Sequence, residues 1–429
     1  MKKLSTDRKF LYLVVAEFPY GHGEIFLRDE IGLLSQEFEH VYLVIPDDSK
    51  IKPGLYKSPL PDNVSICALK SKTEIIDRIR ILPKAWNEFY GLEGKSVIDG
   101  LRNENKSDLF RILWGYWALS NSFKRQFKRL LKSHQHQPQE VTFYSYWFFY
   151  PTIALAEIKE KNPHYRAISR MHGWDCFFER SPHNYLPLRP YSINRLDLLA
   201  SISETGMRYT ETKLKGYFDS SKLIFSRLGI TGNQTSSLQK DESETFLLIS
   251  LAYISPVKRL NRIAEALLGW KGKKIKWEHI GVAYDENRSF EDSVNVQFKD
   301  HPTVSVSFKG ELQQKEIFEY FTVERPDLLI CTSESEGIPV SMMEAMAYGV
   351  PVLSVDVGGV HEIVEHRKNG LLIPAAATEN EIRSALEEFI AFSPETKKAM
   401  RQNAVNTYED KFNAQKNYTT FVQTVLKGQ

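Results

Sequence analysis

Short apolar runs alternate with segments of helical periodicity along the whole chain of 429 residues. Such alternation predicts an α/β protein whose parallel sheets are covered by helices. In the first half, the runs that predict strands are Phe10–Val15, Val41–Ile45, Val64–Leu69, Val141–Tyr144, Ala167–Arg170, Leu198–Ile202 and Leu223–Phe225. In the second half they are Phe246–Ser250, Ile275–Ile280, Val304–Phe308, Leu328–Cys331 and Pro351–Val355. The pattern therefore predicts two doubly wound domains, and the ligands of such domains bind at the carboxyl ends of the strands.

A polar segment without periodicity separates the two halves. It covers Thr231–Thr245 and reads TGNQTSSLQKDESET, which is typical of a linker. We therefore expect a first domain over residues 1–230, a second over residues 246–408 and a helical segment over residues 409–429. Two domains of ordinary size suit the length of the chain.

Composition and charge narrow the class of protein. Hydrophobic residues make up 42% of the chain, which is enough for two cores, and the formal net charge is only +2. The charges are interspersed, so nothing overall indicates a protein that binds nucleic acid. The three cysteines, Cys67, Cys176 and Cys331, lie far apart without metal-ligand spacing. We expect them to be reduced thiols in a cytoplasmic protein.

The stretch over residues 333–363, SESEGIPVSMMEAMAYGVPVLSVDVGGVHEI, carries the strongest chemical signal. Pro339 suits the first position of a helix of about ten residues, and Gly349 marks its end. Glu344 falls in the apolar body of this helix, where a lone carboxylate is costly unless something pairs with it. Free N–H groups and the helix dipole favour an anion at the helix start, which predicts a phosphate site beside hydroxyl groups. The alternative is that Glu344 pairs with a basic residue and Glu336 only caps the helix.

The pattern S-x-x-E-G-I-P-x-x-x-x-E-A-M-A-x-G-x-P-V, followed by V-G-G-x-x-E-I-V, resembles the donor-site signature of the family 4 glycosyltransferases. The resemblance implies a retaining enzyme with the GT-B fold. In that fold two Rossmann-like domains face a central cleft, and a C-terminal helix crosses back to the first domain. The resemblance implies that Glu336 contacts the donor sugar and that Glu344 binds the ribose hydroxyls of the nucleotide. It assigns the diphosphate to the backbone of Gly337, Ile338, Pro339 and Val340.

A second segment, SLAYISPVKRLNRIAEALLGW, predicts a helix that starts at Ser255 and Pro256. Lys258 and Arg259 then fall in or just before the first turn, where a cation opposes the helix dipole and a bound anion would remove the conflict. The alternative is a solvated pair of charges. By the resemblance, Lys258 clamps the donor diphosphate and Arg259 also binds the donor. The family usually has an arginine where this chain has Tyr253, so either Arg259 supplies the second charge or phosphate binding is weaker.

Two pieces of the first half also resemble the family. AEFPYGHGEIFLRDEIGLL resembles its N-terminal loop and helix, in which Gly21 and Gly23 permit a tight turn and Gly23 belongs to the donor site. Phe26 replaces the third glycine of a dinucleotide fingerprint. SRMHGWDCFFER resembles the segment in which a histidine after a strand points into the cleft, which assigns a catalytic role to His172. Asp175 would orient this segment. The alternative for His172 is a structural role, which is more common for a lone histidine.

The chain has no Asp-x-Asp sequence and no cluster of side chains with metal spacing, so we expect no metal and no cofactor. Lys258, Arg259 and helix N–H groups would neutralise the diphosphate instead. The function we expect is transfer of a sugar from a UDP or GDP sugar to a surface glycan or a lipid-linked oligosaccharide. One alternative is a non-catalytic GT-B partner subunit of another transferase. Another is a glycoside hydrolase that uses Glu336 and Glu344, which needs two carboxyl groups about 5 to 9.5 Å apart.

A basic and aromatic segment runs from Arg102 to Lys132 and holds eight basic and two acidic residues. Its interleaved apolar residues are Phe110, Leu113, Trp114, Tyr116, Trp117, Phe123 and Phe127. A basic aromatic helix can lie on an anionic membrane surface, and an ordinary helix packed by its aromatic side is the alternative. The first interpretation would suit a lipid-linked acceptor and a peripheral location at the inner face of the membrane.

Overall fold

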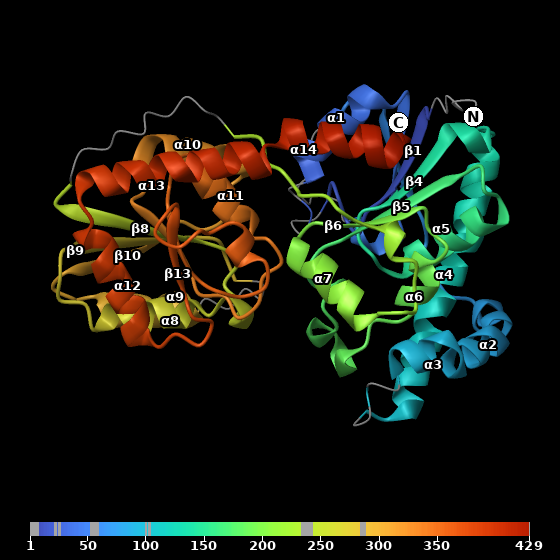
Figure 1. The fold of residues 1–429 in the computed structure, drawn as a ribbon, viewed down its shortest axis with the longest axis horizontal. Coiled ribbons are helices and arrows are strands. Elements are labelled where there is room, and N and C mark those ends of the chain that lie inside the picture. The colour runs from blue at the N-terminus through green and yellow to red at the C-terminus, as the bar shows by residue number, and fades with distance from the viewer. Residues whose placement is uncertain are drawn as a thin grey trace. The chain divides into compact units, whose positions relative to one another are not determined.

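The structure is a computed structural model and describes residues 8–20, 24, 27–51, 60–98, 101, 104–232, 243–283 and 289–428. The chain divides into two compact units (Figure 1). Unit 1 comprises Met1–Leu228 and Ala414–Gln429, and unit 2 comprises Gly229–Asn413. Most of the predicted linker, residues 233–242, lies outside the described residues.

Unit 1 is built on a parallel sheet of seven strands in the order β3-β2-β1-β4-β5-β6-β7. The strands are β1 (Phe10–Val14), β2 (His40–Ile45), β3 (Val64–Ala68), β4 (Val141–Ser145), β5 (Arg166–Met171), β6 (Leu198–Ser201) and β7 (Leu223–Phe225). Phe10 of β1 is in register with His40 of β2 and with Val141 of β4. The seven strands predicted in the first half are confirmed, because strands of a covered parallel sheet read as nearly continuous apolar runs.

Unit 2 is built on a parallel sheet of six strands in the order β10-β9-β8-β11-β12-β13. The strands are β8 (Thr245–Leu251), β9 (Lys274–Ile280), β10 (Val304–Phe308), β11 (Leu328–Cys331), β12 (Val352–Val355) and β13 (Gly370–Ile373). The five predicted strands of this half are confirmed. The edge strand β13 was not predicted, because it has only four residues, begins with a glycine and carries too short an apolar run.

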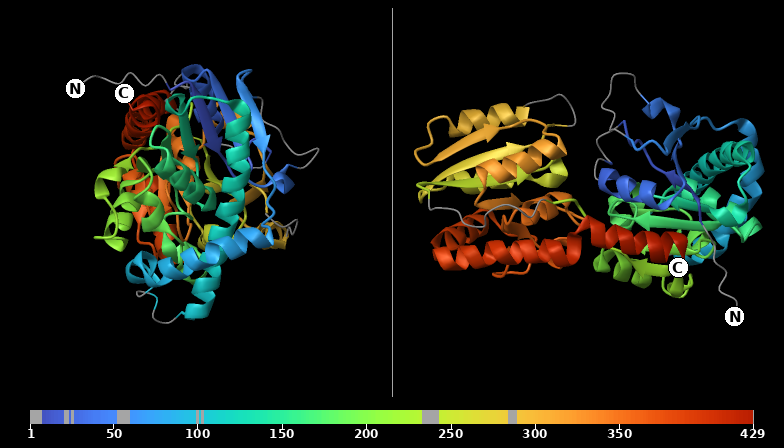
Figure 2. Two further views of the ribbon diagram at one scale, coloured as in Figure 1. Left: turned by 90° about the vertical axis from the view of Figure 1, so that its right-hand side faces the viewer. Right: turned by 90° about the horizontal axis from the view of Figure 1, so that it is seen from above.

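Helices cover both faces of the sheet in unit 1 (Figure 2). They are α1 (Leu27–Glu37), α2 (Ile75–Tyr90), α3 (Leu92–Ser96), α4 (Lys106–His134), α5 (Tyr150–Lys161), α6 (Arg189–Ile193), α7 (Glu204–Lys213) and α14 (Ala414–Thr420). Along β1, Tyr12 packs into the core under α2 and α4, whereas Leu11 and Leu13 pack into the core under α1. This alternation is the signature of a sheet with two buried faces.

The helices of unit 2 enclose a core of their own around β8, β9 and β11. They are α8 (Leu260–Leu268), α9 (Ser289–Phe298), α10 (Gln314–Glu324), α11 (Val340–Ala347), α12 (Glu379–Ala391) and α13 (Pro394–Thr407). Each unit is therefore doubly wound, as the alternation of strands and helices predicts.

The C-terminal segment returns to unit 1, as the family resemblance implied. Helix α14 lies beside α1 (Figure 1), and the π-helical segment Phe421–Lys427 that follows it buries Phe421, Val422 and Leu426 in the core of that face. The guanidinium of Arg166 donates a hydrogen bond of 2.8 Å to the carbonyl oxygen of Val425. Apolar burial and this bond together anchor the end of the chain on the first sheet.

Helix α4 contains most of the basic aromatic segment, and its aromatic side chains face inward. Trp117, Phe123 and Phe127 are buried in the core of unit 1, and Phe110, Trp114 and Tyr116 pack against it. The structure therefore matches the alternative of a helix packed by its aromatic side. Among the helices of the described residues, none is long and apolar enough to cross a membrane.

Candidate functional site

Two loops meet at the carboxyl edge of the sheet in unit 2. One follows β8 and the other follows β11, and these two strands are direct neighbours, so both loops leave the same edge. The N–H of Glu334 donates to the carbonyl oxygen of Val257 at 2.8 Å. The hydroxyl of Thr332 donates to the carbonyl oxygen of Arg259 at 2.9 Å. These two hydrogen bonds fix the loop after β11 against the loop after β8.

A helical turn does begin at Ser255 and Pro256 as predicted, but it is not continuous with the helix that follows. Pro256 opens a single 3₁₀ turn that ends at Lys258, and α8 begins only at Leu260. Arg259 separates the two with a left-handed backbone (φ 48°), which a residue with a Cβ adopts at a cost of about 1 to 3 kcal/mol. Lys258 and Arg259 therefore lie just before the helix, on a backbone that the β11 loop holds in place.

Both cations have acidic partners on the loop after β11. The ammonium of Lys258 lies 2.7 Å from Oε1 of Glu336, and their side chains are 26% and 10% exposed. The guanidinium of Arg259 lies 2.5 Å from Oε1 of Glu334, which is more open to solvent. The pair of Arg259 and Glu334 is the more exposed of the two, and exposed ion pairs contribute only about 0 to 1 kcal/mol, so an anionic ligand can replace Glu334 at little cost. Glu334 had no assigned role in the sequence, because nothing in its spacing shows a partner 75 positions away.

Helix α11 follows Glu336 closely, but Pro339 is its N-cap and not its first residue. The helix has eight residues and ends at Ala347; Gly349, two positions later, has a φ of 70°. Glu344 is 7% exposed and lies among the buried methionines of α11. The structure thus places Glu336, the backbone of residues 337–340 and Glu344 along one loop and one helix.

Two glycines hold the Glu336 loop from the other side. A Cβ on Gly358 would stand 1.8 Å from the carbonyl oxygen of Glu336, and the backbone of Gly358 has a φ of +54°. The N–H of Gly359 donates to the carbonyl oxygen of Gly337 at 2.9 Å. Only glycine permits backbone to approach backbone this closely. The sequence contained these residues in its V-G-G pattern without assigning them this contact.

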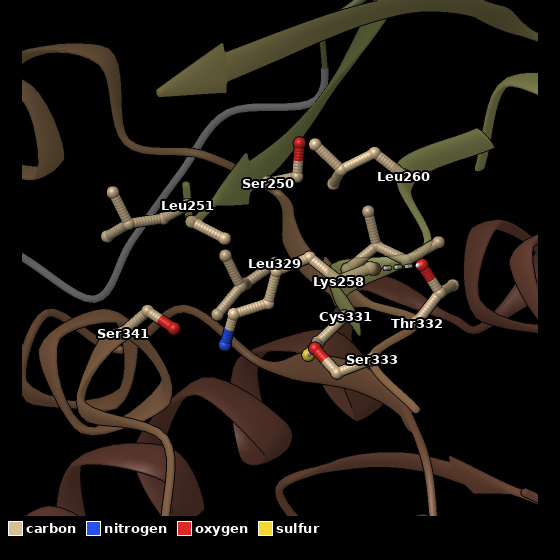
Figure 3. A pocket seen from close by; sticks show the side chains of 11 residues that line it. Ser250, Leu251, Lys258, Leu260, Leu329, Cys331, Thr332, Ser333 and Ser341 are labelled. Carbon is tan, nitrogen blue, oxygen red and sulfur yellow. Dashed lines mark hydrogen bonds between the residues drawn. The ribbon is translucent and has the colours of Figure 1, made fainter. Parts of the chain in front are cut away.

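A small pocket opens between the two loops (Figure 3). Its lining includes Ser250, Lys258, Cys331, Ser333 and Ser341. Burial raises the pKa of the Cys331 thiol, and the charge of Glu336 raises it further. The thiol therefore stays protonated at neutral pH and contributes no charge to the pocket.

His172 belongs to unit 1 and lies directly after β5. Its backbone N–H donates to Oδ1 of Asp175 at 2.7 Å, and Oδ2 of Asp175 accepts from the N–H of Phe148 at 2.8 Å. The ring contacts those of Tyr146 and Trp147, with centroids 4.7 and 4.3 Å apart. Burial lowers the pKa of His172 and outweighs the opposing effect of Asp175, so the imidazole is neutral at neutral pH. Asp175 thus orients this segment through the backbone.

Glu24 organises the loop after β1 and had not been identified from the sequence. Its buried carboxylate accepts hydrogen bonds of 2.7 to 2.8 Å from the backbone N–H groups of Ala16, Glu17 and Phe18. It also accepts one of 2.5 Å from the indole of Trp147, the residue that contacts His172. Gly21 and Gly23, which the sequence assigned to this loop, lie outside the described residues.

The sequence of unit 2 matches a known family. Residues 233–407 fit the model of the family described as "Glycosyl transferases group 1". These residues make up most of unit 2, and this part of the chain is therefore similar to that glycosyltransferase family. The resemblance drawn from residues 333–363 is thereby confirmed.

Among curated relatives, the Escherichia coli K12 protein named "Putative colanic acid biosynthesis glycosyltransferase WcaL" is 30% identical over 234 residues, which are 52% of this chain and 54% of WcaL. The amylovoran biosynthesis glycosyltransferase AmsK of Erwinia amylovora is 28% identical over 36% of this chain and 38% of its own. The chain thus spans about half the length of WcaL and less than half the length of AmsK.

Several solved structures share the fold of this chain. Anabaena Alr3699/HepE in complex with UDP and glucose matches with a TM-score of 0.63 at 15% identity, over 97% of this chain and 99% of its own. The lipopolysaccharide outer core galactosyltransferase WaaB matches with a TM-score of 0.60 at 16% identity, over 97% and 99%. This likeness shows the GT-B fold that the sequence resemblance implied.

The contact of Gly358 with Glu336 predicts a selective effect of one added methyl group. Gly358→Ala should displace the Glu336 loop and cost about 1 to 3 kcal/mol beyond the strain of a left-handed alanine. Gly310→Ala is the matched control, because its φ is +71° and nothing lies within 4 Å of the added Cβ. Denaturant unfolding of both variants measures the difference. Equal stability of the two would contradict the account of the glycine contact.

Proposed function

We propose that the protein is a retaining glycosyltransferase that moves a sugar from a UDP or GDP sugar to a hydroxyl of a surface glycan or a lipid-linked oligosaccharide. The match of residues 233–407 to the group 1 family supports the transfer reaction. The names of WcaL and AmsK support a role in polysaccharide synthesis, and the UDP bound to HepE supports a uridine donor. We further propose a cytoplasmic location, peripheral on the inner face of the membrane, where a lipid-linked acceptor would lie.

The observation that carries this proposal is the contact of 2.7 Å between Lys258 and Glu336 at the carboxyl edge of the sheet. A diphosphate oxygen offers Lys258 the same charge as the carboxylate does, with a comparable charge-assisted hydrogen bond. Donor binding would therefore exchange one ion pair for another and leave Glu336 to face the sugar. Arg259 would likewise exchange its solvent-exposed ion pair with Glu334 for an ion pair with the diphosphate.

In this proposal the catalytic power comes from stabilising the leaving diphosphate. The acceptor hydroxyl attacks the anomeric carbon on the face from which the diphosphate departs, and a departing phosphate oxygen takes the hydroxyl proton. Lys258, Arg259 and the first N–H groups of α11 are fixed donors for the developing charge, and such preorganised groups act without reorganising during the reaction. A neutral His172 would serve the sugar as a hydrogen-bonding group and not as a cation.

Glu336 and Glu344 should have separable roles. Glu336→Gln keeps the size and polarity of the side chain but removes the charge that supports positive character on the sugar, so turnover should fall on the order of a hundredfold while nucleotide affinity changes little. Glu344→Ala should weaken UDP or GDP binding through lost hydrogen bonds worth about 1 to 3 kcal/mol. Turnover and calorimetric affinity of the isolated chain measure both effects.

Glu365→Gln is the matched control for these variants, because Glu365 pairs with Lys368 at 2.7 Å in the same unit. It should change neither quantity. Near wild-type turnover by a folded Glu336→Gln variant would remove the catalytic role and return Glu336 to a purely structural one. Absence of nucleotide-sugar turnover by the wild-type chain would favour a non-catalytic partner subunit.

The proposal assigns neutralisation of the diphosphate to Lys258, Arg259 and the helix N–H groups, and so predicts transfer without a divalent metal. Turnover measured in excess EDTA should stay within about twofold of the untreated rate. In this mechanism no metal ion is needed to hold the phosphates on carboxylate ligands. Loss of nearly all activity, restored by magnesium or manganese, would overturn the metal-independent mechanism.

A further inference from the structure

Helix α2 carries an exposed apolar face that nothing else in unit 1 covers among the described residues. Six large hydrophobic side chains of this one helix are exposed, at fractions from 40% to 77%. They are Ile75, Ile76, Ile79, Leu82, Trp86 and Tyr90. Elsewhere in the described part of the chain, large exposed hydrophobic residues occur only singly. Scattered apolar residues are normal on a surface, whereas a contiguous group marks an interaction site.

The six residues form one stripe along the helix. At 3.6 residues per turn they fall, together with Pro83, within an arc of about 120° that contains no polar residue. The opposite side of α2 packs on the core of unit 1 through Ile81, Ala85 and Phe89. The helix is therefore apolar on two faces, and only one of them is used by the fold.

Basic residues border the stripe, and the acidic residues of α2 turn away from it. Arg78 follows one edge and Arg80 the other, and both are exposed. Asp77 is buried against Arg125 at 2.9 Å, and Glu74, at the N-cap, is held by the same arginine at 2.9 Å. Between positions 75 and 90 the exposed side chains include no acid. The exposed surface of α2 thus combines apolar area with positive charge only.

Aromatic rings extend the stripe toward α4. Trp86 lies 5.0 Å from Tyr90 and 5.4 Å from Phe110 of α4, measured between ring centroids. The indole of Trp114 donates to the carbonyl oxygen of Arg78 at 3.0 Å, which ties the two helices together beside the stripe. Figure 1 shows α2 at the outer side of unit 1, away from the sheet. A packed support of this kind presents the stripe as a rigid surface.

We propose that this surface, the α2 stripe with Arg78 and Arg80, docks the protein on an anionic lipid membrane. A stripe of isoleucine and leucine with tryptophan and tyrosine, bordered by arginine, has the composition of a helix that lies in the plane of a membrane interface. Anionic headgroups would supply negatively charged partners for Arg78 and Arg80. A second copy of the chain fits less well, because a two-fold contact through this face would bring like charges together.

This surface differs from the one expected from the sequence. The aromatic side chains of α4, which contains most of residues 102–132, lie in or against the core. The proposed contact with the membrane is therefore on the neighbouring helix α2. The inference rests on the proposed peripheral location, for which it names the surface, and it does not depend on the transfer reaction. A docked α2 would keep unit 1 beside lipid-linked molecules whatever chemistry follows.

The test is flotation of the full chain with vesicles of phosphatidylcholine, with and without phosphatidylglycerol. The wild-type protein should bind the anionic vesicles preferentially and lose binding as salt rises past physiological strength. Ile79→Ser with Trp86→Ser should lower the partition coefficient on the order of tenfold or more. Val296→Ser with Val323→Ser is the matched control, since these residues are 76% and 68% exposed on helices of unit 2, and it should leave binding unchanged. Arg78→Gln with Arg80→Gln should remove most of the preference for anionic vesicles.

Several outcomes would overturn the proposal. They are absence of wild-type binding, equal binding to neutral and anionic vesicles, and an equal loss in the Val296 and Val323 control. A wild-type dimer that becomes monomeric when Ile79 and Trp86 are changed would assign the face to a second copy. UDP affinity, measured in parallel, should be the same in all variants. Lost vesicle binding with intact UDP affinity therefore concerns this surface and the proposed membrane location, and not the proposed transfer reaction.

Discussion

The contact between Lys258 and Glu336 is the interaction on which the candidate site depends. It joins two loops that leave neighbouring strands at the same edge of the sheet, so the order of β8 and β11 decides that the two charges meet. Backbone constraints hold both ends: Arg259 has a left-handed conformation after Lys258, and Gly358 packs on the carbonyl oxygen of Glu336. Strain and close approach of this kind persist where the surrounding structure fixes them, and they commonly accompany a binding site.

Most of the fold could be predicted because its sheets are buried on both faces. Twelve apolar runs were expected as strands and all twelve are present, and among the strands of the described residues only the short edge strand β13 was missed. The side on which a helix is buried was harder to predict. Helices α2 and α4 both mix basic and aromatic residues, and the sequence does not show that α4 turns its rings inward while α2 leaves Trp86 exposed. Such a choice is made by tertiary packing and not by periodicity.

The candidate site was predictable where its residues are close in sequence. Glu336, the backbone after it and Glu344 lie within one loop and one helix, and their pattern is long enough to identify the family. Contacts between distant segments were not visible. The pairing of Glu334 with Arg259 and the hydrogen bond that Glu24 accepts from the indole of Trp147 depend on how the chain folds, and single acidic residues carry no signal of their partners.

The most direct test of the account is the affinity for UDP and GDP after the charge of Lys258 is removed. Calorimetry should show that Lys258→Met weakens binding about 10- to 100-fold, as expected for a charge-assisted hydrogen bond to phosphate worth about 1.5 to 3 kcal/mol. Lys276→Met is the matched control, because Lys276 also pairs with a glutamate at 2.7 Å in unit 2 but lies within β9, away from the loops; it should bind as the wild type does. Unchanged affinity in a folded Lys258→Met variant would contradict the account, because Lys258 would then serve only to neutralise Glu336.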